Sequence, residues 1–138
     1  MPIAVGDPLP AATFKHMSEA GPTDVVSTDL FGAGKTALFA VPGAFTPTCH
    51  QKHMPGFVAN VDAMKAKGVD RIVCVSVNDP FVLAAWGEAT GAAGAGVTLV
   101  ADPDAAFTRS LGLDFDGSVV GLGVRSKRYS MLVEDNVV

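Results

Sequence analysis

The sequence has 138 residues, of which 49% are hydrophobic and 17% charged, which suits one globular domain with a single core. The formal net charge of −4 argues against nucleic acid or an anionic membrane as a partner, because both select basic surfaces. No apolar run is long enough to span a bilayer, and the N-terminus lacks the pattern of a signal peptide. Two cysteines are too few for a disulfide framework, so we expect a reducing, cytoplasmic compartment.

The first half of the chain predicts a small hairpin, a buried strand and a long helix. Residues 3–35 are rich in turn-forming pairs such as Gly21-Pro22 and predict the hairpin. The apolar run at 36–41 predicts the strand. Apolar residues then recur every three or four positions between 48 and 67, which is typical of a helix: Met54, Phe57, Val58, Val61 and Met64. Pro55 should kink or split this helix, because it removes a backbone donor.

The second half alternates between strands and helices. The β-branched run at 70–77 predicts a strand covered on both faces. Asn78-Asp79-Pro80 is typical of a turn and helix cap. The remaining expectations are a helix at 81–89, a flexible connection at 90–96, a strand at 97–100, a short capped helix from Asp102 to about Leu111, a Gly- and Asp-rich loop, a strand at 127–133, a turn at 134–136 and a partner strand beginning at 137.

This alternation predicts an α/β layered fold with a central, mostly parallel sheet and a hairpin at the C-terminal side. We expect a single domain over residues 1–138 with no internal repeat.

Cys49 lies where a strand passes into a helix. The buried strand at 36–41 is followed by the Pro- and Gly-rich string 42–48, and the helical pattern begins at Thr48. Backbone N–H groups and the dipole at a helix N-terminus favour a thiolate over a thiol. A lone cysteine is more often a small buried hydrophobe, but this position favours a reactive one.

The residues around Cys49 resemble a known family. Pro42, Thr46 and Cys49 match the peroxiredoxin pattern P-x-x-x-T-x-x-C, and the strings 42–49 and 53–57 resemble its type-five, or type II, subfamily. Downstream, Arg125-Ser126-Lys127-Arg128-Tyr129 is similar to the arginine segment of that subfamily. The resemblance implies a thioredoxin-like fold, with a central mixed β-sheet flanked by helices, and reduction of hydrogen peroxide and alkyl hydroperoxides.

The resemblance also implies a role for each matching residue. Cys49 attacks the peroxide and becomes a sulfenic acid. Thr46 supplies a hydroxyl to the sulfur and a peroxide oxygen, Arg125 polarises both, and Pro42 shields the site from water. Gly43, Phe45 and Thr48 complete the substrate-binding set. No metal or organic cofactor is needed, because thiolate nucleophilicity and positioned donors suffice.

How the sulfenic acid is reduced is left open by the sequence. Cys74 lies in a β-branched strand and is favoured as an inert core thiol, with a resolving role as the alternative. No cysteine follows it, so we expect an external reductant, either glutathione with glutaredoxin or thioredoxin. Relatives normally continue beyond residue 138 with a further helix, which this chain is expected to lack. The resemblance also implies a homodimer, with Phe45 and the loop at 111–116 as contact surfaces.

Parts of the sequence resemble four other kinds of function or site, most of which lack a required residue. A redox sensor or relay protein would use the same cysteine but would not turn over. A disulfide oxidoreductase needs a second thiol three residues on, where Lys52 stands. Cys49, His50 and His53 are too few for a closed zinc site. Gly32-Ala33-Gly34-Lys35-Thr36 resembles the end of a phosphate-binding loop, but it precedes a strand and lacks the first glycine.

Overall fold

The structure is a computed structural model that describes residues 2–46 and 54–138. Met1 and residues 47–53 lie outside the described part. The expectations for Thr48, Cys49, His50 and His53, and for the first turns of the helix expected from residue 48, fall on those residues.

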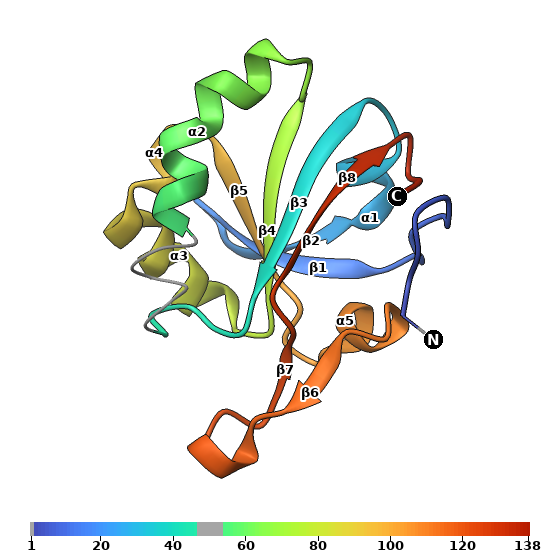
Figure 1. Ribbon diagram of the computed structural model, residues 1–138. Coiled ribbons are helices and arrows are strands. Elements are labelled where there is room, and N and C mark those ends of the chain that lie inside the picture. Colours follow the sequence, from blue (N-terminus) through green and yellow to red (C-terminus); the bar gives the residue numbers. More distant parts are fainter. Residues whose placement is uncertain (1, 47–53) are drawn as a thin grey trace.

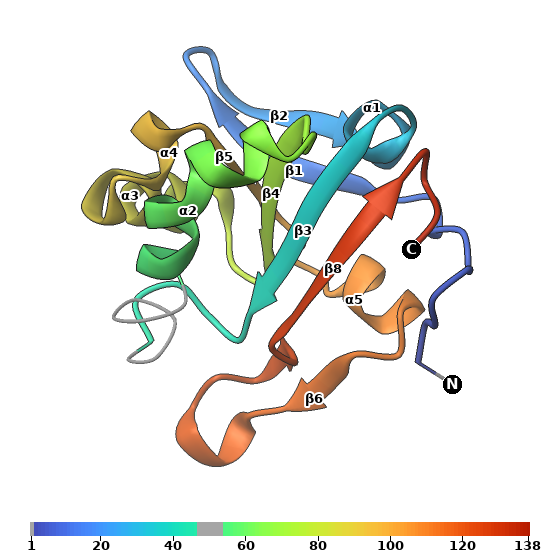
Figure 2. The same cartoon turned by 45° about the horizontal axis from the view of Figure 1, so that its top comes forward.

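Within the described residues, six strands form one twisted sheet in the order β2-β1-β5-β4-β3-β8 (Figures 1 and 2). Their bounds are β1 Thr13–Ser18, β2 Gly21–Val26, β3 Lys35–Val41, β4 Arg71–Ser76, β5 Val97–Ala101 and β8 Tyr129–Glu134. The pairs β3–β4 and β4–β5 are parallel, whereas β1–β2, β1–β5 and β3–β8 are antiparallel. The sheet is therefore mixed, and the expectation of a mostly parallel sheet is wrong because both flanks of the parallel centre run the other way.

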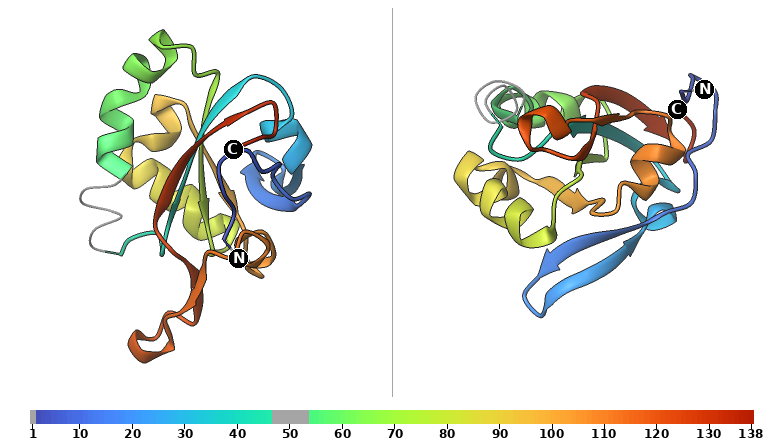
Figure 3. Two further views of the ribbon diagram at one scale, coloured as in Figure 1. Left: turned by 45° about the vertical axis from the view of Figure 1, so that its right-hand side comes forward. Right: turned by 90° about the horizontal axis from the view of Figure 1, so that it is seen from below.

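Helices cover both faces of the sheet (Figure 3). On one face lie α2 Met54–Ala66, α3 Pro80–Thr90 and α4 Ala92–Ala95; on the other lie α1 Ser27–Phe31 and α5 Ala106–Ser110. The central strand β4 contributes alternate side chains to the two cores, with Ile72 and Cys74 on the α2–α3 side and Val73 and Val75 on the α5 side. This confirms a strand that is covered on both faces, which its near-continuous apolar sequence predicts.

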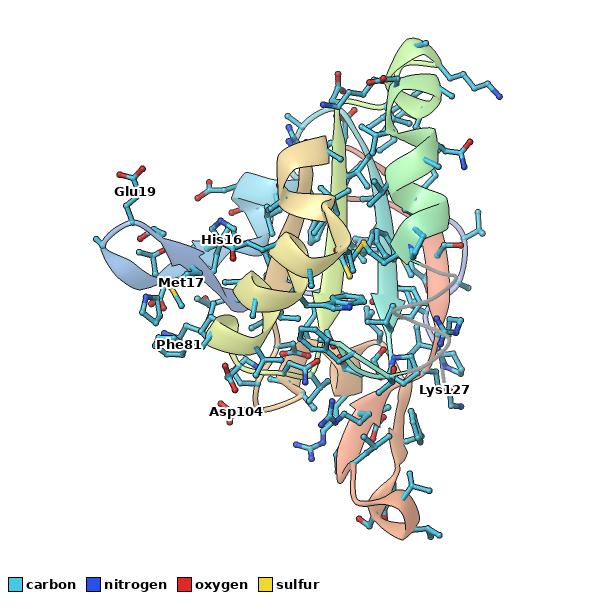
Figure 4. All side chains as sticks on the ribbon, turned by 90° about the vertical axis from the view of Figure 1, so that its left-hand side faces the viewer. His16, Met17, Glu19, Phe81, Asp104 and Lys127 are labelled. Carbon is cyan, nitrogen blue, oxygen red and sulfur yellow. The ribbon has the colours of Figure 1, made fainter. Side chains whose placement is uncertain are left out.

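Each core is built around aromatic side chains. On the α2–α3 side, Trp86 is fully buried, and the rings of Phe39 and Phe57 stack with their centroids 3.8 Å apart. On the other side, Phe14 meets the edges of Phe31 and Phe107. In contrast, Phe81, labelled in Figure 4, lies in the first turn of α3 and is 65% exposed. The buried aromatic rings hold the helices against the sheet and so fix where the strand ends lie.

The helix and turn signals around α3 and α2 are confirmed in the described residues. Asp79 is the N-cap of α3, and its side chain accepts a hydrogen bond from the backbone N–H of Val82 at 2.8 Å. Pro80 occupies the first helical position, as its fixed φ favours. In α2, Met54 and Val61 are buried, and Phe57, Val58 and Met64 pack against the same core.

Two expectations about the connecting segments are wrong, and one helix is missing from them. The segment 90–96 is not a flexible connection, because α4 forms within it and buries Ala92. The Gly- and Asp-rich segment after Leu111 is not a plain loop: β6 Asp114–Asp116 and β7 Val124–Ser126 pair as a hairpin around the short 3₁₀ helix η2 Ser118–Val120. The helix α1 was not expected from the turn-rich N-terminal sequence.

Candidate active site

The residues that follow β3 form a turn at the edge of the sheet where the parallel strands end. We call residues 42–46 the β3 turn. The hydroxyl of Thr46 donates a hydrogen bond to the carbonyl oxygen of Gly43 at 2.6 Å, and the backbone N–H of Thr46 points at the same oxygen at 3.3 Å. Because the hydroxyl hydrogen is used within the turn, the lone pairs of Thr46 Oγ1 remain as acceptors.

Arg125 reaches the β3 turn from a segment 83 residues further along the chain. Its Nη1 donates to the carbonyl oxygen of Pro42 at 3.3 Å, and its Nε donates to the carbonyl oxygen of Leu122 at 2.8 Å. The backbone of Arg125 is held by pairing with Phe115 in the β6–β7 hairpin, which projects at the bottom of Figure 1. Two carbonyl acceptors and a paired strand thus orient the guanidinium group toward the turn.

Gly43 has no room for a side chain. A Cβ atom at this position would lie 2.7 Å from Nη1 of Arg125 and 3.1 Å from Cγ2 of Thr46. Glycine therefore allows the guanidinium group and the threonine side chain to approach the same stretch of backbone. The structure brings together Pro42, Gly43, Thr46 and Arg125, four of the residues that the sequence singles out.

The β3 turn is tied to the neighbouring strand through Asn78. The backbone N–H of Ala44 donates to Oδ1 of Asn78 at 3.1 Å. The hydroxyl of Ser76, at the end of β4, donates to the same oxygen. The sequence predicts for Asn78 only a turn before α3, because nothing local to residues 76–78 indicates that they reach the β3 turn.

Phe45 has a different environment from its neighbours in the turn. It is 50% exposed and adopts a positive φ of 63°, which is unusual for a bulky residue. Such strain persists only where surrounding contacts hold it, and it is common at functional sites. Cys49 and Thr48, the remaining predicted site residues, lie outside the described part of the chain.

Cys74 lies away from the β3 turn. It is fully buried in the middle of β4, paired with Phe39 of β3 and Leu99 of β5, and it is not disulfide-bonded. A thiol with no exposure to water is poorly placed for exchange with another sulfur, because exchange requires access.

The hydroxyl group of Tyr129 lies in a buried environment that strongly shifts its pKa. Burial of its hydroxyl group raises the pKa of Tyr129 well above its usual range, and the nearby Cys74 thiol and Asp102 carboxyl group act in the same direction. The hydroxyl oxygen is buried, and no hydrogen-bond partner is found for it in the described structure. The phenol therefore stays protonated and uncharged, and Tyr129 packs against the core cluster on the α5 side of the sheet.

One of the alternative sites lies in the described residues, whereas the metal ligands considered at Cys49, His50 and His53 lie outside them. Within 2–46 and 54–138, no three His, Cys, Asp or Glu side chains are grouped so that they could hold a metal ion. Gly32 caps the end of α1, and Lys35 and Thr36 already belong to strand β3, so this glycine segment is a turn before a strand. No helix in the described chain combines the length and the apolar character required to cross a membrane.

Comparison with known sequences identifies the family. The sequence profile of the redoxin family matches residues 4–138. The chain is 52% identical to the chloroplastic peroxiredoxin-2E-2 of Oryza sativa subsp. japonica over 140 residues, covering 99% of this chain and 62% of the rice protein. It is 48% identical to peroxiredoxin-2B of Arabidopsis thaliana, with 97% of this chain and 83% of that protein covered.

Solved structures lead to the same family. Reduced Prx3 of Vibrio vulnificus in complex with H2O2 superposes with a TM-score of 0.93 at 48% identity, covering 99% of this chain and 84% of that one. Peroxiredoxin 5 of Alvinella pompejana gives 0.87 at 37% identity, with 99% and 86% covered. The chain belongs to the redoxin family and, within it, to the peroxiredoxins, and its fold is thioredoxin-like. It spans 62% of the length of the rice relative, which is therefore the longer protein.

Proposed function

We propose that this protein is a thiol-dependent peroxidase that reduces hydrogen peroxide and alkyl hydroperoxides through Cys49. The observation that carries the proposal is the meeting of Arg125, Gly43 and Thr46 at the end of β3, beside the cysteine in sequence. Family membership supports it, and the Vibrio vulnificus relative has been solved with H2O2 bound.

In the proposed reaction the Cys49 thiolate attacks one peroxide oxygen in line with the O–O bond. A sulfur–oxygen bond forms, the O–O bond breaks, and the departing oxygen takes a proton to leave as water or an alcohol. The sulfur loses two electrons and the peroxide gains them. The guanidinium group of Arg125 stabilises the negative charge that develops on the oxygens, while Thr46 Oγ1 accepts a hydrogen bond from the peroxide.

We further propose that an external thiol reduces the sulfenic acid of Cys49. The first thiol forms a mixed disulfide and releases water, and a second thiol then frees Cys49 as the donor disulfide leaves. The complete burial of Cys74 supports an external donor over an internal one. Glutathione with glutaredoxin and thioredoxin are the two candidate systems.

The compartment and the assembly belong to the same proposal. A sequence with two cysteines suits a reducing compartment such as the cytoplasm, although relatives include chloroplastic and mitochondrial proteins. A homodimer is supported by the exposure of the Phe45 ring and of the Val119 and Val120 side chains in η2, at the tip of the β6–β7 hairpin. In the loop at 111–116, Leu111 is buried within the chain, so the exposed part of a contact there would come from Asp116.

A redox sensor that uses the same cysteine is the alternative, and turnover separates the two functions. Hydrogen peroxide consumption should be followed with the glutathione–glutaredoxin and thioredoxin systems side by side. A peroxidase consumes many equivalents of peroxide per protein with at least one system. Consumption that stops at one equivalent with both systems would favour the sensor.

A further inference from the structure

We propose that Asn78 is a positioning residue of the candidate active site. Its side-chain oxygen holds the β3 turn, and through that turn it sets where Gly43 and Thr46 stand relative to Arg125. The inference rests on the peroxidase function proposed above and adds a residue that the family pattern in the sequence does not contain.

The contacts of Asn78 fix the orientation of its amide. The backbone N–H of Ala44 can only donate, so the atom that faces it at 3.1 Å must be the oxygen of Asn78. The hydroxyl of Ser76 donates to the same oxygen from the end of β4, where Ser76 is fully buried. A buried hydroxyl on a rigid strand thus holds the rotamer of the side chain that anchors the turn.

Asn78 and its neighbour Asp79 have separate roles. Asp79 caps α3 by accepting from the N–H of Val82, whereas the hydrogen bonds of Asn78 go to the β3 turn and to β4. The anchor is therefore not needed to begin α3. Its effect falls on residues 43–46, which lie on either side of the Ala44 N–H and include the positive-φ residue Phe45.

The β3 turn tolerates little movement. The space at Gly43 is so limited that a Cβ atom would come within 2.7 Å of Arg125 Nη1, so a shift of Ala44 would change the approach of Arg125. The same shift would move Thr46, because both its N–H and its hydroxyl bond to the carbonyl of Gly43. Displacing a positioning group by about 1 Å can cost on the order of 100-fold in rate.

Two rates measured on the same thiol test this role. The rate constant of thiol oxidation by hydrogen peroxide depends on the positioning of the peroxide by Thr46 and Arg125, whereas alkylation by iodoacetamide reports only the amount and access of thiolate. Both are measured by stopped flow on the full chain for wild type, Asn78→Ala, Asn78→Asp and Ser76→Ala. The matched control is Asn60→Ala: Asn60 is an exposed residue on α2, and its side-chain amide donates to the carbonyl oxygen of Gly56 within the same helix.

We expect Asn78→Ala to lower the peroxide rate constant about tenfold or more while alkylation stays within about twofold of wild type. Asn78→Asp should restore the ratio of the two rates, because a carboxylate accepts the same two hydrogen bonds, even if its charge slows both reactions equally. Ser76→Ala should give a smaller loss, since it frees the rotamer but leaves the acceptor. Asn60→Ala should match wild type in both reactions.

The inference is overturned if Asn78→Ala keeps the wild-type peroxide rate, or if both rates fall by the same factor in a folded protein. Should Asn78→Ala fail to fold by circular dichroism, Ser76→Ala decides the matter by the same ratio. A wild-type protein that alkylates normally but does not react with peroxide would instead overturn the proposed peroxidase function, so the two failures are distinguishable.

Discussion

Gly43 leaves no space for a side chain between the β3 turn and Arg125. Its φ is not in the positive range, so alanine fits the backbone there, but the added Cβ would lie 2.7 Å from the end of the Arg125 side chain. A flexible guanidinium group can move away at little cost in stability. Gly43→Ala should therefore displace the Arg125 side chain while leaving the stability of the fold nearly unchanged.

We predict that Gly43→Ala lowers the rate constant for peroxide about tenfold or more and changes the melting temperature little, because alanine also restricts the unfolded chain. Stopped-flow oxidation and thermal unfolding check the two parts. Gly94→Ala on α4 is the matched control, since its added Cβ would have no atom within 4 Å apart from its chain neighbours and its own helix backbone. A melting temperature that falls along with the rate would show that Gly43 serves the fold instead.

Tyr129 is the single tyrosine of the chain, so its ionisation can be followed alone. Its folded pKa is raised by burial above the unfolded value of about 10. Above that pH the unfolded state loses the phenolic proton and the folded state keeps it, so this group makes stability fall as pH rises. We predict that tyrosinate absorbance appears only when the protein unfolds.

Tyr129→Phe should remove this alkaline loss of stability. Because the buried hydroxyl has no hydrogen-bond partner in the described structure, the variant should be at least as stable as wild type at neutral pH. Urea unfolding at about pH 7 and at about pH 10.5, near the unfolded pKa of tyrosine, compares the two proteins. A destabilised Tyr129→Phe variant would mean that the hydroxyl has a partner after all.

Cys74 gives a prediction that separates stability from function. Cys74→Ser puts a hydroxyl into an apolar core cluster and should cost about 1–3 kcal/mol in unfolding free energy. The variant should still turn over peroxide with the external thiol that serves the wild type. If it is oxidised by peroxide but no longer turns over with thioredoxin, Cys74 is the resolving thiol and the one-cysteine cycle is wrong.

At the scale of the elements, two aspartates accept hydrogen bonds from the first turns of helices in unequal surroundings. Asp79 is the N-cap of α3, whereas α5 begins at Ala106 with Ala105 as its N-cap, later than the start at Asp102 that the sequence predicts. Asp102 is buried and accepts hydrogen bonds from the N–H groups of Phe107 and Thr108 and from the hydroxyl of Thr108. Asp79 is exposed, and among the described residues its side chain accepts one hydrogen bond, from the N–H of Val82. Losing a cap leaves backbone donors unpaired, and the penalty is larger where water cannot replace the lost partner.

We therefore predict that Asp79→Ala lowers the unfolding free energy by about 1 kcal/mol and that Asp102→Ala lowers it by about 3 kcal/mol. Urea unfolding measures both. Equal losses would contradict the importance of burial for the hydrogen bonds that Asp102 accepts from α5.

The elements that carry their own local signals are the ones the sequence predicts well. The apolar run of β4 and the Asp79-Pro80 start of α3 need no distant contact to be recognised. The β6–β7 hairpin is different, because its strands are only three residues long, lie in a segment rich in Gly and Asp, and form through their pairing with each other. In α4, small residues next to glycines form one turn because Ala92 is buried against neighbouring elements.

At the scale of the whole molecule, the candidate site is assembled from three separate segments. The β3 turn, residues 76–78 and the β6–β7 hairpin meet where the parallel strands end. Periodicity and turn chemistry could not bring Arg125 to Pro42, and only the resemblance of its segment to a family indicated a role. Asn78 lies outside the motif, so its contact with Ala44 became visible only in three dimensions.

The identity of the oxidised residue is the most direct test of the proposed peroxidase. The protein is mixed with one equivalent of hydrogen peroxide and dimedone, which traps sulfenic acids, and the adduct is located by mass spectrometry. We predict an adduct on Cys49 in wild type and Cys74→Ser, and neither adduct formation nor peroxide consumption in Cys49→Ser. A Cys49→Ser protein that consumes peroxide as fast as wild type would contradict the proposal.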